Sequence, residues 1–179
     1  MNVRSGYSLT LVACLAISSM ANAHEPKPPA VTPDNGSALV QGMPVYVQNI
    51  SPAAADAVKV VDAFSAAIKA GKLDEAGNLL DPDVLILESG SSERTRDQYM
   101  RSHAIADAAF MQTAKQLLRY RHAQADVNFA WVATESTLSA LADGKEIVLL
   151  STETMLLKNT DTGWKIVHIH WSSRPAPKS

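Results

Sequence analysis

The chain has 179 residues, 46% of them hydrophobic, which is enough for one globular domain with a sizeable core. Its 16 basic and 18 acidic residues give a formal net charge of −2. No basic stripe or arginine cluster occurs along the sequence, which excludes nucleic acid as an expected partner.

Residues 1–23 are expected to be a signal peptide. Arg4 supplies a short positive region, the run YSLTLVACLAIS is apolar, and ANA places a small-residue cleavage site after Ala23. The apolar run is too short to span a bilayer. We therefore expect a periplasmic or secreted protein that has no membrane attachment after signal cleavage.

An alternative is a lipoprotein anchored at Cys14, whose context LVAC is similar to the lipobox of bacterial lipoproteins. Cleavage there would leave the apolar stretch LAISSMANA where lipoproteins carry a polar tether, which favours the free form. Cleavage after Ala23 removes the only cysteine, so the mature chain has no disulfide, thiolate metal site or thiol nucleophile.

Residues 24–51 form a leader rich in proline, which excludes regular helix. Within it, PVYVQNI (44–50) could dock as an edge strand. A helix is then predicted from Ser51-Pro52, because serine caps helices and proline suits their first turn. Its apolar residues recur at helical spacing, and Gly71 marks its end.

The middle of the chain predicts two further helices and one strand. KLDEAGNLLDPD gives a short helix that ends before Pro82, and VLILE (84–88) reads as a strand. SGSS (89–92) is expected to be a loop, and a long helix is predicted over about 94–114.

The last third predicts four strands rich in β-branched and aromatic residues, at 115–129, 130–142, 146–158 and 163–174. The segments ADGKE and NTDTG read as hairpin turns between the last three. Helices followed by antiparallel strands indicate an α+β fold, with helices on one face of the sheet. A strongly bent sheet of this kind would enclose a cavity.

The order of these elements resembles the nuclear transport factor 2-like superfamily, and more closely its SnoaL-like and calcium/calmodulin-dependent kinase association-domain-like branches. The resemblance is carried by AFSAAIKAGKLDEAGNLLDPDVLILESG and by the closing strand GWKIVHIHWSS. It covers residues 52–174 as one domain, with a C-terminal tail at 175–179. This fold hosts isomerases, dehydratases, cyclases, binding modules and oligomerisation domains, so it does not define an activity.

The resemblance implies a cone-shaped α+β barrel with a conical pocket between the bent sheet and the long helix. It also implies a homodimer packed through the outer sheet face. Pocket residues in this family come from the long helix, the first strand and the last strand. Carried over by position, they are Glu88, Tyr99, His103, Asp107, His168 and His170.

Tyr99, His103 and Asp107 follow one another at intervals of four residues on the expected long helix. Asp107 could hold the His103 ring, making this pair a general base with Tyr99 as a hydrogen-bond donor. The alternative is an ordinary pair on a solvent-facing surface, with Tyr99 in the core. Ketosteroid isomerase uses an aspartate base with a tyrosine and a protonated aspartate; Glu88 could be a base here, but the second donor is missing from the expected places.

His168 and His170 alternate on the last strand and are expected on its inward face, with Trp171 on the outer face. With His103 they could form a three-nitrogen site for a divalent metal. The alternative is one histidine that binds the pocket ligand and one near the rim. No other cofactor is expected.

Three further residues carry open alternatives. Glu153 is a candidate pocket acid if its register turns it inward. Arg119 and Arg121 alternate on one strand and could bind an anionic ligand or form ion pairs at a dimer interface, and the second is favoured.

The leading hypothesis is an exported domain that binds a small, partly apolar molecule, as a homodimer. The first alternative is an isomerase, dehydratase or hydrolase that uses His103–Asp107 as its base. The second alternative is a periplasmic metal-binding protein that uses His103, His168 and His170.

Overall fold

The computed structural model describes residues 46–142 and 145–177. The predicted signal peptide, the lipobox at Cys14, most of the proline-rich leader and the end of the tail lie outside the described residues.

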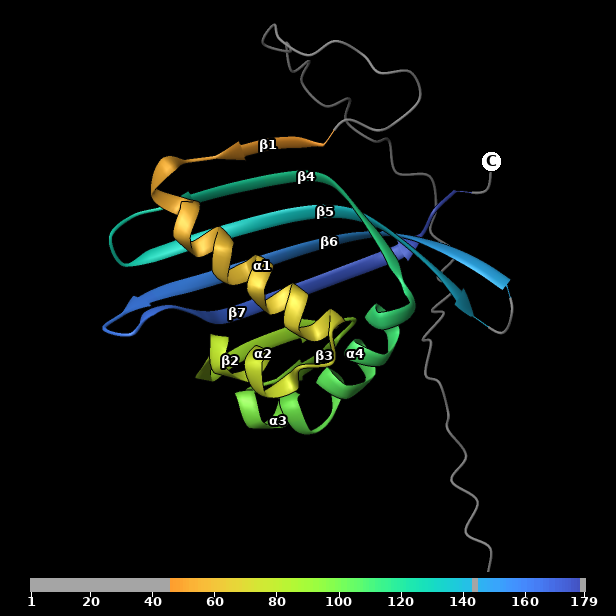
Figure 1. Cartoon of the computed structure of the whole chain (residues 1–179), viewed down its shortest axis with the longest axis horizontal. Coiled ribbons are helices and arrows are strands. Elements are labelled where there is room, and N and C mark those ends of the chain that lie inside the picture. Colours follow the sequence, from red (N-terminus) through yellow and green to blue (C-terminus); the bar gives the residue numbers. More distant parts are fainter. Residues whose placement is uncertain (1–45, 143–144, 178–179) are drawn as a thin grey trace, which may run out of the picture. The chain divides into compact units, whose positions relative to one another are not determined.

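A seven-stranded sheet forms the centre of the described domain, in the order β1-β4-β5-β6-β7-β2-β3 (Figure 1). Pairing is antiparallel except for β1 with β4 and β2 with β7, which run parallel. The predicted edge strand and the closing four-stranded meander are confirmed. The strands are β1 (Val47–Ile50), β2 (Leu80–Glu88), β3 (Ser91–Glu93), β4 (Lys115–Ala125), β5 (Phe129–Ala142), β6 (Lys145–Thr160) and β7 (Gly163–Pro175).

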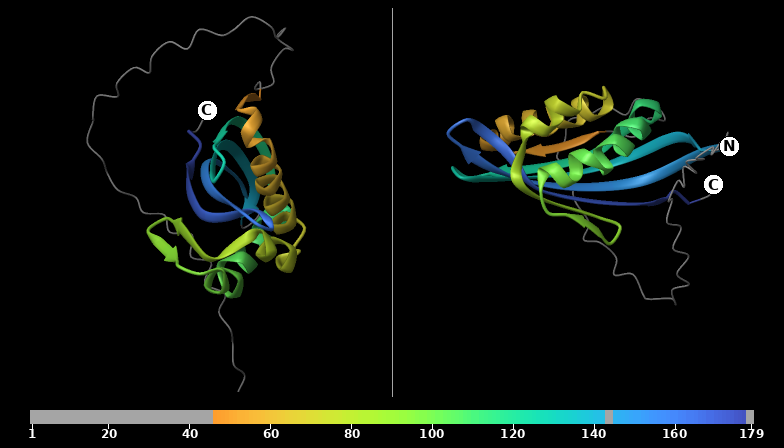
Figure 2. Two further views of the ribbon diagram at one scale, coloured as in Figure 1. Left: turned by 90° about the vertical axis from the view of Figure 1, so that its left-hand side faces the viewer. Right: turned by 90° about the horizontal axis from the view of Figure 1, so that it is seen from below.

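The helices gather on one face of this sheet, called here the inner face, and leave the outer face uncovered (Figure 2). This arrangement confirms the α+β class. No helix among the described residues is long and apolar enough to cross a membrane. The helices are η1 (Pro52–Ala54), α1 (Ala55–Lys69), α2 (Leu73–Leu79), α3 (Arg96–Arg101) and α4 (His103–Thr113).

Helix α1 packs on the sheet through the apolar stripe that its sequence predicts. Val61, Phe64 and Ile68 are spaced three and four residues apart and are all buried. The predicted cap is different, because the Ser51 side chain makes no capping hydrogen bond.

The prediction of a single long helix over 94–114 is wrong, because the helix is interrupted at Ser102. This residue has φ −131° and ψ −88°, outside the helical region, and its hydroxyl donates to the Gln98 carbonyl at 2.8 Å. The chain therefore forms two helices, and His103 becomes the first residue of α4.

The predicted loop at 89–92 is also different. Ser89 and Gly90 have φ of 49° and 85°, as a two-residue hairpin turn of the primed type requires. Ser91 then pairs with Glu88, and Glu93 pairs with Ile86. This hairpin makes a short strand, β3, and brings Glu93 to the inner face beside the helices.

An irregularity in β7 reverses the predicted orientation of its histidines. Leu157 of β6 pairs with Ile166 of β7, and its neighbour Leu156 pairs with His168. Val167 has no partner residue on β6 and forms a one-residue β-bulge. Beyond this bulge, Ile169 is fully buried and His170 is exposed.

Trp171 confirms this reversal. Its ring lies 6.1 Å from that of the buried Tyr99, on the inner face. The predictions that His168 and His170 point inward and that Trp171 points outward are therefore wrong, because a one-residue bulge exchanges the faces.

The orientation of β7 can be tested with two adjacent alanine substitutions. Ile169→Ala should lower the free energy of unfolding by about 2–5 kcal/mol, because it leaves a cavity in a packed core. His170→Ala should change it by about 0.5 kcal/mol or less, because the side chain is exposed. Urea denaturation followed by circular dichroism measures both. Equal losses, or a larger loss for His170→Ala, would contradict the register of β7.

Candidate functional site

Five polar side chains meet where β2 and β3 approach α3 and α4. They form what we call the acidic cluster: Glu88, Glu93, Tyr99, His103 and Asp107. Four of the five belong to the set that the sequence predicts, so the structure brings together most of the predicted residues. His168 and His170 are not part of it.

Tyr99 occupies the base of the acidic cluster. Its side chain is fully buried, with its ring 6.5 Å from Phe64 and 6.1 Å from Trp171. Its hydroxyl donates a hydrogen bond to Oδ2 of Asp107 at 2.9 Å. Tyr99 is thus a core residue that fixes Asp107, rather than an exposed residue of a pocket wall.

His103 pairs through Nδ1 with Oε1 of Glu93, and not with Asp107 as predicted. The difference has two structural causes. The break at Ser102 starts a new helix at His103, and the β2–β3 hairpin delivers Glu93 to the imidazole. The His103 side chain is 44% exposed, so this pair has one buried and one accessible partner.

Glu93 is the residue of the cluster that sequence reasoning missed. It is only 7% exposed, and its second oxygen, Oε2, is buried without a hydrogen-bond partner among the described residues. The signal was present in the sequence: Ser89-Gly90 suits a tight hairpin turn, and a return strand would have placed Glu93 opposite Ile86.

Burial shifts the two remaining carboxyl groups in the same direction. It raises the pKa of Glu88, and the nearby Asp107 carboxylate raises it further, while His103 opposes this. Burial also raises the pKa of Asp107, against the hydrogen bond from Tyr99 and the charge of His103. Both carboxyls are therefore able to hold a proton at higher pH than ordinary acidic side chains.

The Tyr99 hydroxyl remains protonated and acts as a hydrogen-bond donor. Burial first, and then the Asp107 carboxylate, raise the pKa of its hydroxyl well above the ordinary value. The hydroxyl consequently stays protonated at physiological pH, and its hydrogen bond favours the ionised form of Asp107.

A second polar network lies further across the inner face. Glu153 is turned inward and accepts a hydrogen bond from Nε1 of Trp171 at 2.8 Å. Burial raises its pKa, opposed by this bond and by the charge of Arg121. Arg121 is 5% exposed and binds Asp62 of α1 at 2.6 Å, so its buried charge is paired.

The structure separates Arg121 from Arg119, although the two arginines alternate on one strand. The register shifts between Leu118 and Tyr120, and this bulge separates the two arginines. Arg121 points inward to Asp62, whereas Arg119 is exposed.

The three histidines proposed for a metal are not brought together. His103 lies with the acidic cluster, while His168 and His170 lie beyond the bulge of β7 on the outer face. Nδ1 of His168 is instead 2.8 Å from the Leu85 carbonyl. Within residues 46–142 and 145–177, no three histidine, cysteine, aspartate or glutamate side chains are arranged so that they could hold a metal ion.

Comparison with solved structures shows the fold. A proposed ketosteroid isomerase from Shewanella frigidimarina is 26% identical, with a TM-score of 0.62, and the match covers 68% of this chain and 98% of that one. A proposed calcium/calmodulin-dependent protein kinase II association domain from Xanthomonas campestris is 22% identical, with a TM-score of 0.59, and the match covers 74% and 99%. A proposed dehydratase of the NTF2-like family from Streptomyces avermitilis is 19% identical, with a TM-score of 0.57, and the match covers 69% of this chain and 95% of that one.

No curated protein matches this sequence. The family model of the SnoaL-like domain matches residues 58–177, which spans the described helices and strands from α1 to the end of β7. This match agrees with the order of elements and with the NTF2-like structures above. The chain therefore belongs to the SnoaL-like family of NTF2-like proteins.

Proposed function

We propose that the protein binds a small, partly apolar molecule at the acidic cluster and transfers a proton on it, as an isomerase or dehydratase does. The observation that carries this proposal is the acidic cluster itself, in which the Tyr99 hydroxyl holds Asp107 and the pKa values of both Asp107 and Glu88 are raised, first by burial. Carboxyl groups shifted toward neutrality by burial are typical of acid–base sites. The expected signal peptide makes the periplasm or the medium the proposed place of action.

Two carboxyl groups in one cluster can act as a general base and a general acid. Because ionised Asp107 raises the pKa of Glu88, the proposed working state has Asp107 ionised and Glu88 protonated. Asp107, held by the Tyr99 hydroxyl, is the proposed base that removes a proton from carbon. Glu88 is the proposed acid that returns a proton to the substrate.

The substrate class follows from this chemistry. A carbonyl compound with an acidic C–H bond, or an alcohol that loses water, needs one group to accept a proton and another to donate one. The structure named as a proposed ketosteroid isomerase supports the first class, and the proposed dehydratase supports the second through the shared fold. The pair His103–Glu93 would border the ligand with its exposed imidazole.

Replacing the proposed base should abolish turnover. Asp107→Asn keeps an oxygen for the Tyr99 hydroxyl but cannot accept a proton, so we expect the rate to fall at least about 100-fold. The assay follows isomerisation of a Δ5-3-ketosteroid and solvent-deuterium incorporation into a panel of small ketones, together with dehydration of β-hydroxy ketones. Asp74→Asn on α2, an exposed aspartate far from the cluster in sequence, is the matched control.

Wild-type rates in Asp107→Asn would refute the assignment of the base. If wild-type protein binds members of the panel without turnover, the protein is a binding domain that uses the same cluster, as the leading hypothesis from the sequence states.

The raised pKa of Asp107 also predicts how stability depends on pH. Between the unfolded value, about 4, and the higher folded value, the folded state holds a proton that the unfolded state has released. The contribution of Asp107 to stability therefore falls as pH rises through this window and is fully lost above it. Asparagine does not titrate, so Asp107→Asn should gain in unfolding free energy relative to wild type as pH rises from about 4, reaching a plateau above the folded pKa.

Urea denaturation from pH 4 to pH 8 measures this difference. Asp74→Asn, at an exposed aspartate, is measured in parallel as the control. A difference that is constant for Asp107→Asn would show that Asp107 has the same pKa in both states.

We also propose that the chain forms a homodimer through the apolar part of the outer sheet face, around Trp131 and Leu156. Trp131 and Leu156 are cross-strand partners on that face and are 37% and 38% exposed. Leu85 lies across from them on β2, next to His168, and is similarly exposed. Calcium/calmodulin-dependent kinase hub domains among the structural neighbours are compatible with self-association.

A charge in this apolar surface should prevent the association. Leu156→Arg is expected to halve the mass measured by light scattering after size-exclusion chromatography, because a dimer would bury the arginine without a partner. Leu141→Arg, at a 73% exposed leucine near the other end of β5, should leave the mass unchanged. A monomeric wild type, or an unchanged mass for Leu156→Arg, would contradict this interface.

A further inference from the structure

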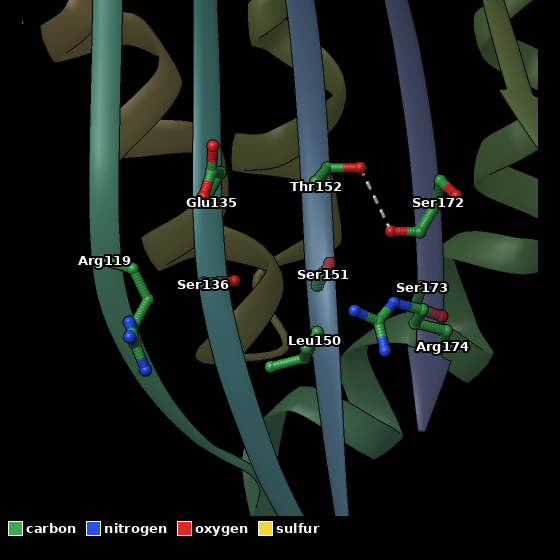
Figure 3. Close-up of a pocket in the computed structure, with 9 residues that line it drawn as sticks. All are labelled: Arg119, Glu135, Ser136, Leu150, Ser151, Thr152, Ser172, Ser173 and Arg174. Carbon is green, nitrogen blue, oxygen red and sulfur yellow. Dashed lines mark hydrogen bonds between the residues drawn. The ribbon is translucent and has the colours of Figure 1, made fainter. Parts of the chain in front are cut away.

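A groove on the outer sheet face has features of a binding site that are independent of the acidic cluster. Its cavity volume is about 470 Å³, within the range of small-ligand sites, and it crosses β4, β5, β6 and β7. In Figure 3 the helices lie behind the sheet, and Arg119 and Arg174 lie on opposite sides of the groove with Leu150 between them.

The two arginines reach the groove for identifiable reasons. The bulge between Leu118 and Tyr120 separates exposed Arg119 from its buried neighbour Arg121. Arg174 pairs in register with Leu150, so both side chains share the outer face. Strand pairing therefore places two guanidinium groups around one apolar side chain.

Neither arginine is neutralised within the described part of the chain. Ion pairs there include Arg121 with Asp62 and Arg101 with Asp97, but none that involves Arg119 or Arg174. Glu135 is the one carboxylate that lines the groove, and it forms no ion pair with either arginine among the described residues. Two positive charges against one negative charge favour an anion.

Hydroxyl groups complete the lining. Ser172 and Ser173 of β7 and Thr152 of β6 border the cavity between the arginines. The Thr152 hydroxyl donates to the Ser172 carbonyl at 3.4 Å, so its proton is already used, and the Ser172 hydroxyl is the donor that this pair offers to a ligand. Guanidinium forks and hydroxyl donors together are the groups that recognise carboxylates.

We propose that this groove binds a small dicarboxylate, with one carboxylate at Arg119, the other at Arg174, and the short carbon chain against Leu150. Two charged walls with an apolar floor require two acidic groups on one molecule. The Ser172 hydroxyl adds a hydrogen-bond donor at the edge of the groove. The site lies on the opposite face of the sheet from Asp107 and Glu88, so it does not depend on their proposed chemistry.

Isothermal titration calorimetry of the purified full chain with succinate and glutarate tests this proposal, with butyrate and inorganic phosphate as comparison probes. We expect saturable binding of a dicarboxylate, and binding of butyrate at least about tenfold weaker, because it can engage only one guanidinium. Arg119→Gln and Arg174→Gln should each weaken dicarboxylate binding about tenfold or more. Arg101→Gln, an exposed arginine on α3, should leave it unchanged.

Three outcomes would overturn the proposal. The first is no binding of either dicarboxylate, or equal binding by the arginine variants. The second is phosphate or butyrate binding as tightly as succinate, which would indicate a general anion site. The third is a change in oligomeric mass in Arg119→Gln or Arg174→Gln without dicarboxylate binding by wild type, which would show that a second copy of the chain occupies the groove. Far-ultraviolet circular dichroism of each variant verifies its fold.

Discussion

The extra residue at Val167 is the constraint on which the two faces of the sheet depend. Ile166 before it and Ile169 after it are both fully buried, although strict alternation would put them on opposite faces. By absorbing one residue, the bulge lets β7 turn Ile166, Ile169 and Trp171 to the same face. Without it, Trp171 would leave Tyr99, and the two histidines would enter an apolar core without partners.

The acidic cluster depends on this packing. Trp171 contacts Tyr99, and Tyr99 holds Asp107 through its hydroxyl, so the orientation of β7 is transmitted to the proposed base. Nε1 of Trp171 donates a hydrogen bond to Glu153, which also holds the indole ring in place. Burial raises the pKa values of Asp107 and Glu153, and the hydrogen bonds from Tyr99 and Trp171 oppose this shift.

The two faces of the sheet consequently differ in chemistry. The inner face carries buried carboxyls and a buried arginine that is paired with Asp62. The outer face carries exposed apolar residues around Trp131 and, further along β5, the groove between Arg119 and Arg174. Both sets arise from the same strands, and two bulges, at Arg119 and Val167, determine which side chains appear on which side.

The sequence by itself determined the α+β class, the order of the elements, the family resemblance and four residues of the acidic cluster. The class and the order of the elements depend on local periodicity and turn residues, which are properties of short stretches of sequence. The four residues came from the family resemblance, carried over by position. Only the tertiary structure decided the partner of His103, the role of Glu93 and the orientation of His168 and His170. A helix break at Ser102 and a two-residue turn at Ser89-Gly90 bring His103 and Glu93 together. A bulge at Val167 shifts β7 by one residue, which in a sheet exchanges the faces. The positions of the break, the turn and the bulge are set by how helices and strands bury each other's apolar surfaces, which is a property of the whole fold.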